Sequence, residues 1–183
     1  MKKFLSLVLC IIFALCLCAC GDKNGKKDSH SVDVEYYAKL GQINEVNYKL
    51  GDDVDTTKET LSTATKDDED QFLYYDYTSG DYTVMTDGTV CCCYKTEDKS
   101  SGLTNIVKYG DAYGFNQGAI STKVRDTMAV LGFTASEREA KSGELFFLPS
   151  SGTLTVLQYD FDTNTVLFVF EEHALSATVI YKR

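Results

Sequence analysis

The segment Thr165-Val-Leu-Phe-Val-Phe-Glu171 consists almost entirely of β-branched and aromatic residues, which favour strands. Side chains alternate between the two faces of a strand, and here both alternating sets are apolar. Leu167 and Val169 point to one side, whereas the aromatic Phe168 and Phe170 point to the other. A strand that is apolar on both faces needs cover on both faces. The segment therefore predicts a buried strand in a strand-rich domain.

The same pattern occurs earlier in the chain. Three alignments define the repeat: Thr89-Val-Cys-Cys-Cys-Tyr-Lys95 over Thr165–Glu171 at an offset of 76 residues, Thr78–Met85 over Ser150–Leu157 at 72, and Asn105–Lys108 over Thr178–Tyr181 at 73. Loop insertions account for offsets that differ by a few residues. The alignments predict an internal duplication, with chance similarity among strand-rich segments as the alternative.

A short helical pattern precedes each set of strands. In the first, Asp55 or Thr56 is a candidate cap for a helix over 57–64. In the second, Ser121 is a candidate cap for a helix over 122–131, which Gly132 would close. Within it Val124, Met128 and Leu131 fall on one face, the spacing of a helix that packs on a sheet.

These patterns predict an α+β fold of two tandem repeats, each a short helix or helix pair followed by an antiparallel β-meander. The expected boundaries are a signal at 1–20, a flexible tether at 21–31, a first repeat at 32–113 and a second repeat at 114–183. The tether, GDKNGKKDSHS, has no apolar side chain that could be buried in a core, so we expect it to be flexible.

Residues 1–20 have the three parts of a bacterial export signal. Lys2 and Lys3 come first, the apolar run Phe4–Leu15 follows, and Leu17-Cys18-Ala19-Cys20 resembles a lipobox, in which Cys20 would carry a diacylglycerol. Two acyl chains suffice for stable membrane anchoring. The alternatives are a transmembrane anchor, for which the apolar run is short, or secretion after ordinary cleavage. We therefore expect a lipid-anchored protein at the cell membrane, facing outside the cytoplasm.

The part of the chain beyond the tether is acidic. Residues 32–183 contain 13 Lys and Arg against 25 Asp and Glu, a net charge of −12. This charge argues against nucleic acid as a partner and would repel anionic lipid headgroups. The expected contact with the membrane is therefore the lipid anchor at Cys20.

Several segments of the sequence resemble lipoproteins of Gram-positive bacteria whose mature part looks like two copies of the β-lactamase-inhibitor-protein repeat. The resemblance covers roughly residues 47–182 and rests on Tyr48-Lys-Leu-Gly51, Gly80-Asp-Tyr-Thr-Val-Met-Thr-Asp-Gly88, Val124 to Phe133, and Thr178-Val-Ile-Tyr181. It implies a curved antiparallel sheet with helices on the convex side and an open concave face. In the best-known relatives this face grips another protein.

The repeat divides the strand residues into an aliphatic set and an aromatic set. Cys91 and Cys93 align with the aliphatic set, whose small side chains suit the side under a helix, so we expect the aromatic set on the open face. Aromatic residues are common anchors at protein interfaces. The predicted partner-binding residues are Tyr75, Tyr77, Tyr82, Tyr94, Phe168 and Phe170. The alternative is that these rings fill the core.

The remaining motifs predict no catalytic, redox or metal-binding site. Cys91, Cys92 and Cys93 are contiguous, which suits neither a disulfide framework nor the usual zinc spacings, so we interpret them as packing residues rather than a soft-metal or redox site. His173 is predicted to be a surface histidine, and Asp67-Asp-Glu-Asp70 a solvated loop. Asp160–Glu171 imitates a calcium loop but lacks its bend glycine, so we expect Asp162-Thr-Asn164 to form a hairpin turn.

The sequence thus predicts no catalytic residue, no cofactor and no metal site. The favoured function is a membrane-anchored, non-catalytic module that binds or inhibits another exported or surface protein. The alternatives are a lipoprotein that binds a glycan or peptide ligand and, less favoured, a hydrolase without a recognisable motif.

Overall fold

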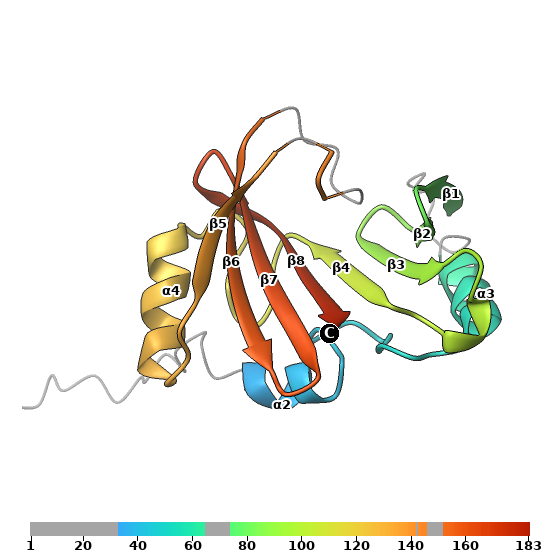
Figure 1. The fold of residues 1–183 in the computed structure, drawn as a ribbon, viewed down its shortest axis with the longest axis horizontal. Coiled ribbons are helices and arrows are strands. Elements are labelled where there is room, and N and C mark those ends of the chain that lie inside the picture. The colour runs from blue at the N-terminus through green and yellow to red at the C-terminus, as the bar shows by residue number, and fades with distance from the viewer. Residues whose placement is uncertain (1–32, 65–73, 142, 146–151) are drawn as a thin grey trace, which may run out of the picture.

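In the described residues, eight antiparallel strands form one continuous sheet (Figure 1). The computed structural model describes residues 33–64, 74–141, 143–145 and 152–183. The strands are β1 (Tyr75–Ser79), β2 (Tyr82–Thr86), β3 (Val90–Lys95), β4 (Asn105–Tyr109), β5 (Ser136–Ala140), β6 (Leu154–Phe161), β7 (Asn164–Glu171) and β8 (Ala174–Lys182). The helices are α2 (Val34–Lys39), α3 (Val54–Ala64), α4 (Ser121–Val130) and the 3-10 turn η1 (Lys99–Ser101).

The expected architecture of two tandem helix-plus-meander repeats is wrong. The strand order is β1-β2-β3-β4-β8-β7-β6-β5, so β4 and β8 join all strands into one sheet with Ile106 opposite Ile180 and Val107 opposite Val179. These four side chains are fully buried. Two separate meanders would leave β4 and β8 as exposed apolar edges, and pairing the two strands removes both edges. The predicted boundary at residues 113/114 falls in the connection between β4 and α4.

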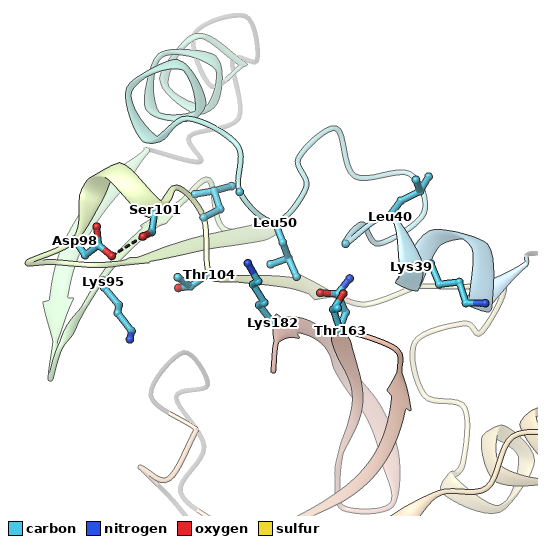
Figure 2. Close-up of a pocket in the computed structure, with 13 residues that line it drawn as sticks. Lys39, Leu40, Leu50, Lys95, Asp98, Ser101, Thr104, Thr163 and Lys182 are labelled. Carbon is cyan, nitrogen blue, oxygen red and sulfur yellow. Dashed lines mark hydrogen bonds between the residues drawn. The ribbon is translucent and has the colours of Figure 1, made fainter.

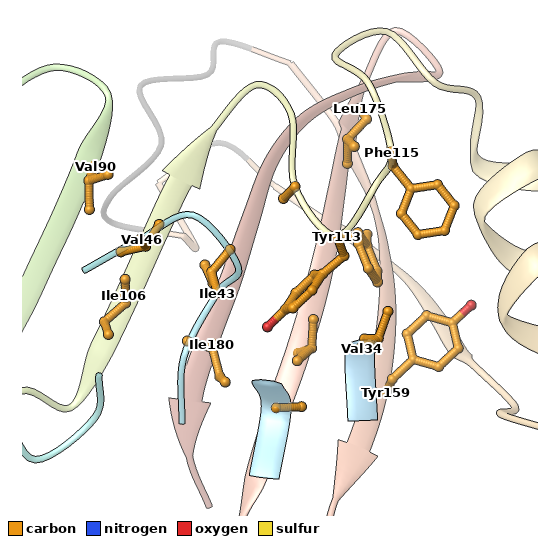
Figure 3. Packing of buried hydrophobic residues seen from close by; sticks show 14 of the residues in the cluster. Val34, Ile43, Val46, Val90, Ile106, Tyr113, Phe115, Tyr159, Leu175 and Ile180 are labelled. Atoms are coloured by element: carbon orange, nitrogen blue, oxygen red, sulfur yellow. The ribbon is translucent and has the colours of Figure 1, made fainter. Parts of the chain in front are cut away.

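Helices and connecting segments cover one face of the sheet, called here the helix face. Val34 and Ala38 of α2, Leu61 of α3, and Val124 and Met128 of α4 all belong to its core. The sheet contributes apolar residues such as Phe168 and Ile180 to the same cluster, part of which is drawn in Figure 3. Burial of these side chains contributes about 25 cal/mol per Å² of apolar surface removed from water.

A second apolar cluster lies on the opposite face, called here the thiol face. It contains Cys91 and Cys93 of β3, Val169 of β7 and Val179 of β8. Leu145, in the segment that follows β5, is also buried in this cluster. Apolar packing on both faces explains why β7 is buried along almost its whole length.

The helix limits differ slightly from the prediction. The carboxylate of Asp53, rather than Asp55 or Thr56, caps α3 by accepting hydrogen bonds from the backbone amide and hydroxyl of Thr56, each at 2.8 Å. Ser121 is the first residue of α4 and not its cap. Val124 and Met128 are buried as predicted, whereas Leu131 lies beyond the helix and is 46% exposed.

The observed turns agree with the sequence-based predictions better than the helix limits do. β6 and β7 are joined at Asp162 and Thr163, which confirms the predicted hairpin and excludes the helix-flanked geometry of a calcium loop there. His173 lies exposed in the turn between β7 and β8, with a positive φ of 72°. No helix among the described residues has both the length and the apolar character needed to cross a bilayer.

Candidate functional site

The fold separates the six predicted partner-binding residues onto different faces. Tyr77 pairs with Val84, and Val84 pairs with Cys93, so these three side chains share the thiol face. Strand alternation places Tyr75 and Tyr82 there as well. The other three predicted residues, Tyr94, Phe168 and Phe170, belong to the packing of the helix face.

Phe168 and Phe170 are fully buried, which removes them from the candidate surface. The Phe168 ring makes edge contacts with Tyr113, Phe115 and Tyr159, with centroid separations of 6.1, 5.4 and 5.8 Å. The expectation that the aromatic set forms the open face is therefore wrong. The large rings fill the volume between the sheet and its helices, and Cys91 and Cys93 lie on the other side.

The structure instead presents an exposed tyrosine pair on a terminal strand. The rings of Tyr75 and Tyr77 are stacked, with centroids 6.0 Å apart and an interplanar angle of 23°. The two residues are 54% and 37% exposed, and β1 lies at the end of the strand order of the described sheet. Stacking restrains both rings, which lowers the entropy lost if a partner contacts them.

Thiols and a third tyrosine lie on the same face. The Tyr109 hydroxyl is 3.3 Å from Cys91 Sγ. Burial, and then the neighbouring thiols, raise the pKa of the Tyr77 phenol. Burial is also the main cause of the raised pKa of Tyr109. Both phenols therefore stay neutral near pH 7 and keep their hydroxyl protons for hydrogen bonding.

Tyr109 was not predicted as part of this surface, although the sequence contained the signal. Alternation along Asn105–Tyr109 places Val107 and Tyr109 on one side of β4. What the sequence lacked was the register: Cys91 lies opposite Val107, which brings Tyr109 to the Cys91 thiol. We define the tyrosine surface as Tyr75, Tyr77, Tyr82 and Tyr109.

In the described part of the chain, the consecutive cysteines Cys91 to Cys93 are free, buried and divided between the faces, with Cys92 on the helix face. Burial raises the pKa of each thiol, so all three are protonated at neutral pH and are weak nucleophiles. No cluster of three metal-ligating side chains occurs within the part of the chain that the structure describes. Cys20, His30 and the acidic run Asp67–Asp70 lie outside the described residues.

Comparison of the chain with protein-family models, with curated proteins and with solved structures finds no match. The site must therefore be interpreted from its own geometry.

Proposed function

We propose that this protein is a lipid-anchored lipoprotein that binds or inhibits another exported or surface protein without catalysing a reaction. The contact would be made by the tyrosine surface and the adjoining edge strand β1. The observation that carries the proposal is the stacked, exposed pair of Tyr75 and Tyr77 at the end of the sheet.

Two physical properties support this function. Tyrosine combines a large apolar ring with a hydroxyl, so it gains affinity both from burial and from a directed hydrogen bond. In addition, a terminal strand offers backbone groups with which an extended segment of a partner can pair. At β1 the tyrosine rings would contact side chains of the partner, and backbone pairing with the strand edge would fix the direction of the partner's segment.

The anchor and the acidic charge complete the proposal. Acyl chains on Cys20 would hold the domain at the membrane, and the tether at 21–31 would give it reach. The net charge of −12 beyond the tether would keep its surface away from anionic headgroups. The tyrosine surface would then be free to meet neighbouring proteins.

Site-specific photo-crosslinking on intact cells tests the proposal. A photoreactive residue at Ser79, which follows Tyr77 on the same side of β1, should trap a defined protein partner. The same probe at the exposed Lys123 of α4 is the control and should trap nothing comparable.

The double change Tyr75→Ser and Tyr77→Ser should abolish the Ser79 crosslink, whereas Tyr36→Ser should leave it unchanged. Tyr36 is a matched control because it is 56% exposed but lies on α2. Equal crosslinking in both backgrounds would refute the tyrosine surface. Crosslinks to wall polymers alone would support the glycan-binding alternative instead.

A further inference from the structure

A pocket lies at the end of the sheet where β4 begins and β8 ends, and it is independent of the tyrosine surface (Figure 2). It has a volume of about 390 Å³. This volume falls within the usual range for small-molecule sites. Its lining includes apolar side chains, hydroxyl groups and lysines, among them Leu50, Thr104, Thr163, Lys95 and Lys182.

Backbone hydrogen bonds hold the walls of this pocket in place. The Gly51 amide donates to Leu103 O at 2.8 Å, and the Leu103 amide donates to Asp52 O at 3.0 Å. These bonds fix the segment before α3 against the segment before β4. Preformed walls reduce the ordering cost of binding a ligand.

The opposite wall is fixed by side-chain and terminal contacts. Asn164 is buried and donates from Nδ2 to Ala38 O at 2.8 Å, which ties the β6–β7 turn to the end of α2. The Arg183 amide donates to Thr163 O at 2.9 Å. These contacts position the end of α2, the segments before α3 and before β4, and the β6–β7 turn before any ligand arrives.

The lysines of the pocket differ in their partners. Lys39 forms ion pairs with Glu35 at 2.7 Å and with Asp162 at 3.7 Å. Among the described residues, no carboxylate lies within 4.0 Å of the Lys95 or Lys182 amine. Figure 2 shows the Lys182 amine directed toward Leu50, whereas the amines of Lys39 and Lys95 are turned outward.

The acidic group of the pocket is already engaged. The Asp98 carboxylate accepts hydrogen bonds from the hydroxyls of Ser100 and Ser101, and these bonds lower its pKa. Its charge is therefore held toward η1. This leaves Lys182 as a cation that faces the pocket without a carboxylate partner in the described part of the protein.

We propose that this pocket binds a small hydroxylated organic anion whose carboxylate or phosphate pairs with Lys182. Thr104 and Thr163 line the pocket, where their hydroxyl oxygens would meet the ligand hydroxyls; the Thr104 hydroxyl donates to Cys93 O at 3.2 Å, so it would accept from the ligand. Leu40 and Leu50 present apolar surface to a sugar-sized ring. A charge-assisted hydrogen bond from an ammonium group is stronger than a neutral one, so the anionic group would provide much of the affinity. Lys95 at the rim would strengthen the attraction.

Isothermal titration calorimetry with the full-length protein in non-ionic detergent tests this site. The probes are glucuronate, glucose 6-phosphate and uncharged glucose. We expect one or both anions to bind and glucose to bind at least about tenfold more weakly, because glucose lacks the charged partner for Lys182. Comparison of the two anions distinguishes carboxylate from phosphate. Absence of anion binding up to about 10 mM would overturn the proposal.

The change Lys182→Gln should weaken anion binding about tenfold or more, whereas Lys182→Arg should retain most of it. Lys123→Gln removes the same charge from α4, which contributes no residue to the pocket lining, and should have no effect. Equal affinity in the Lys182→Gln and Lys123→Gln variants would show that net charge, not this pocket, governs binding. The crosslinking experiment at Ser79 is unaffected by either result, so the two proposals can fail separately.

Discussion

The hydroxyl of Tyr109 lies 3.3 Å from Sγ of Cys91, on the same face of the sheet as the stacked rings of Tyr75 and Tyr77. Cys91 is 2% exposed, so the thiol is enclosed although the neighbouring tyrosine rings reach solvent. A buried thiol and exposed tyrosine rings therefore share one face of the sheet.

The buried thiols should resist alkylation in the native protein. Burial raises the pKa of Cys91 and Cys93, which lowers the fraction of reactive thiolate and also blocks access of the reagent. Iodoacetamide at about pH 8 should label the 91–93 peptide only after urea is added, as measured by mass spectrometry. Rapid labelling of Cys91 without urea would contradict the described burial.

The protein should lose stability at alkaline pH. In the unfolded chain a thiol ionises near its ordinary pKa of 9.0, whereas burial keeps Cys93 protonated in the folded state well above that pH. The unfolded state then binds fewer protons, so the free energy of unfolding falls as the pH rises above about 9. Urea titrations at about pH 8 and about pH 10.5 should show this decline.

The change Cys93→Ala isolates the contribution of one thiol to that decline. The variant should be less stable at about pH 8 because it leaves a cavity, and above about pH 9 its stability should fall less steeply, by up to about 1.4 kcal/mol per pH unit. Identical slopes for the two proteins would rule out the Cys93 thiol as a source of the pH dependence.

Core and surface aromatics should respond differently to substitution. Phe168→Ala should lower the free energy of unfolding by about 3–5 kcal/mol, because it removes a fully buried ring with three aromatic contacts. Tyr75→Ser should cost less than about 1 kcal/mol, since the ring is 54% exposed. Chemical denaturation measures both, and similar losses would place Tyr75 in the core.

Gly102 should be far less replaceable than Gly80. Both adopt positive φ, 72° and 59°, so alanine at either position carries a backbone cost of about 1–2 kcal/mol. A Cβ on Gly102 would lie 2.5 Å from Gly51 O, whereas nothing lies within 4 Å of a Cβ on Gly80. Thermal unfolding should therefore show a clearly larger loss for Gly102→Ala. Equal losses would mean that the segment containing Gly102 can move away from the backbone of Gly51 at little cost.

Lipidation of Cys20 is the part of the proposal that fractionation tests directly. Cys20→Ser should release the protein from membranes, because the acyl chains and not the acidic domain would hold it there. Cys18→Ser is the matched control and should leave the protein in the membrane fraction. Unchanged membrane retention of the Cys20→Ser protein would refute the lipid anchor.

Local structure followed from the sequence in several places. Alternating apolar residues predicted the strand at Thr165–Glu171, and turn-forming residues predicted the hairpin at Asp162 and Thr163. His173 lies at the surface, as its position beyond an apolar strand indicated. These features depend on neighbours in the chain, so the sequence contains the information that determines them.

Two features depended on tertiary structure: which set of strand side chains faces the helices, and the overall architecture. Alternation showed that Cys91 and Phe168 belong to different sets, but not which set α2 and α4 would cover. Packing decided this, because the large rings fill the space beneath the helices, whereas Cys91 and Cys93 fit on the other side. Likewise, only long-range pairing of β4 with β8 determined that the strands form one sheet, since strand edges are satisfied by partners distant in sequence.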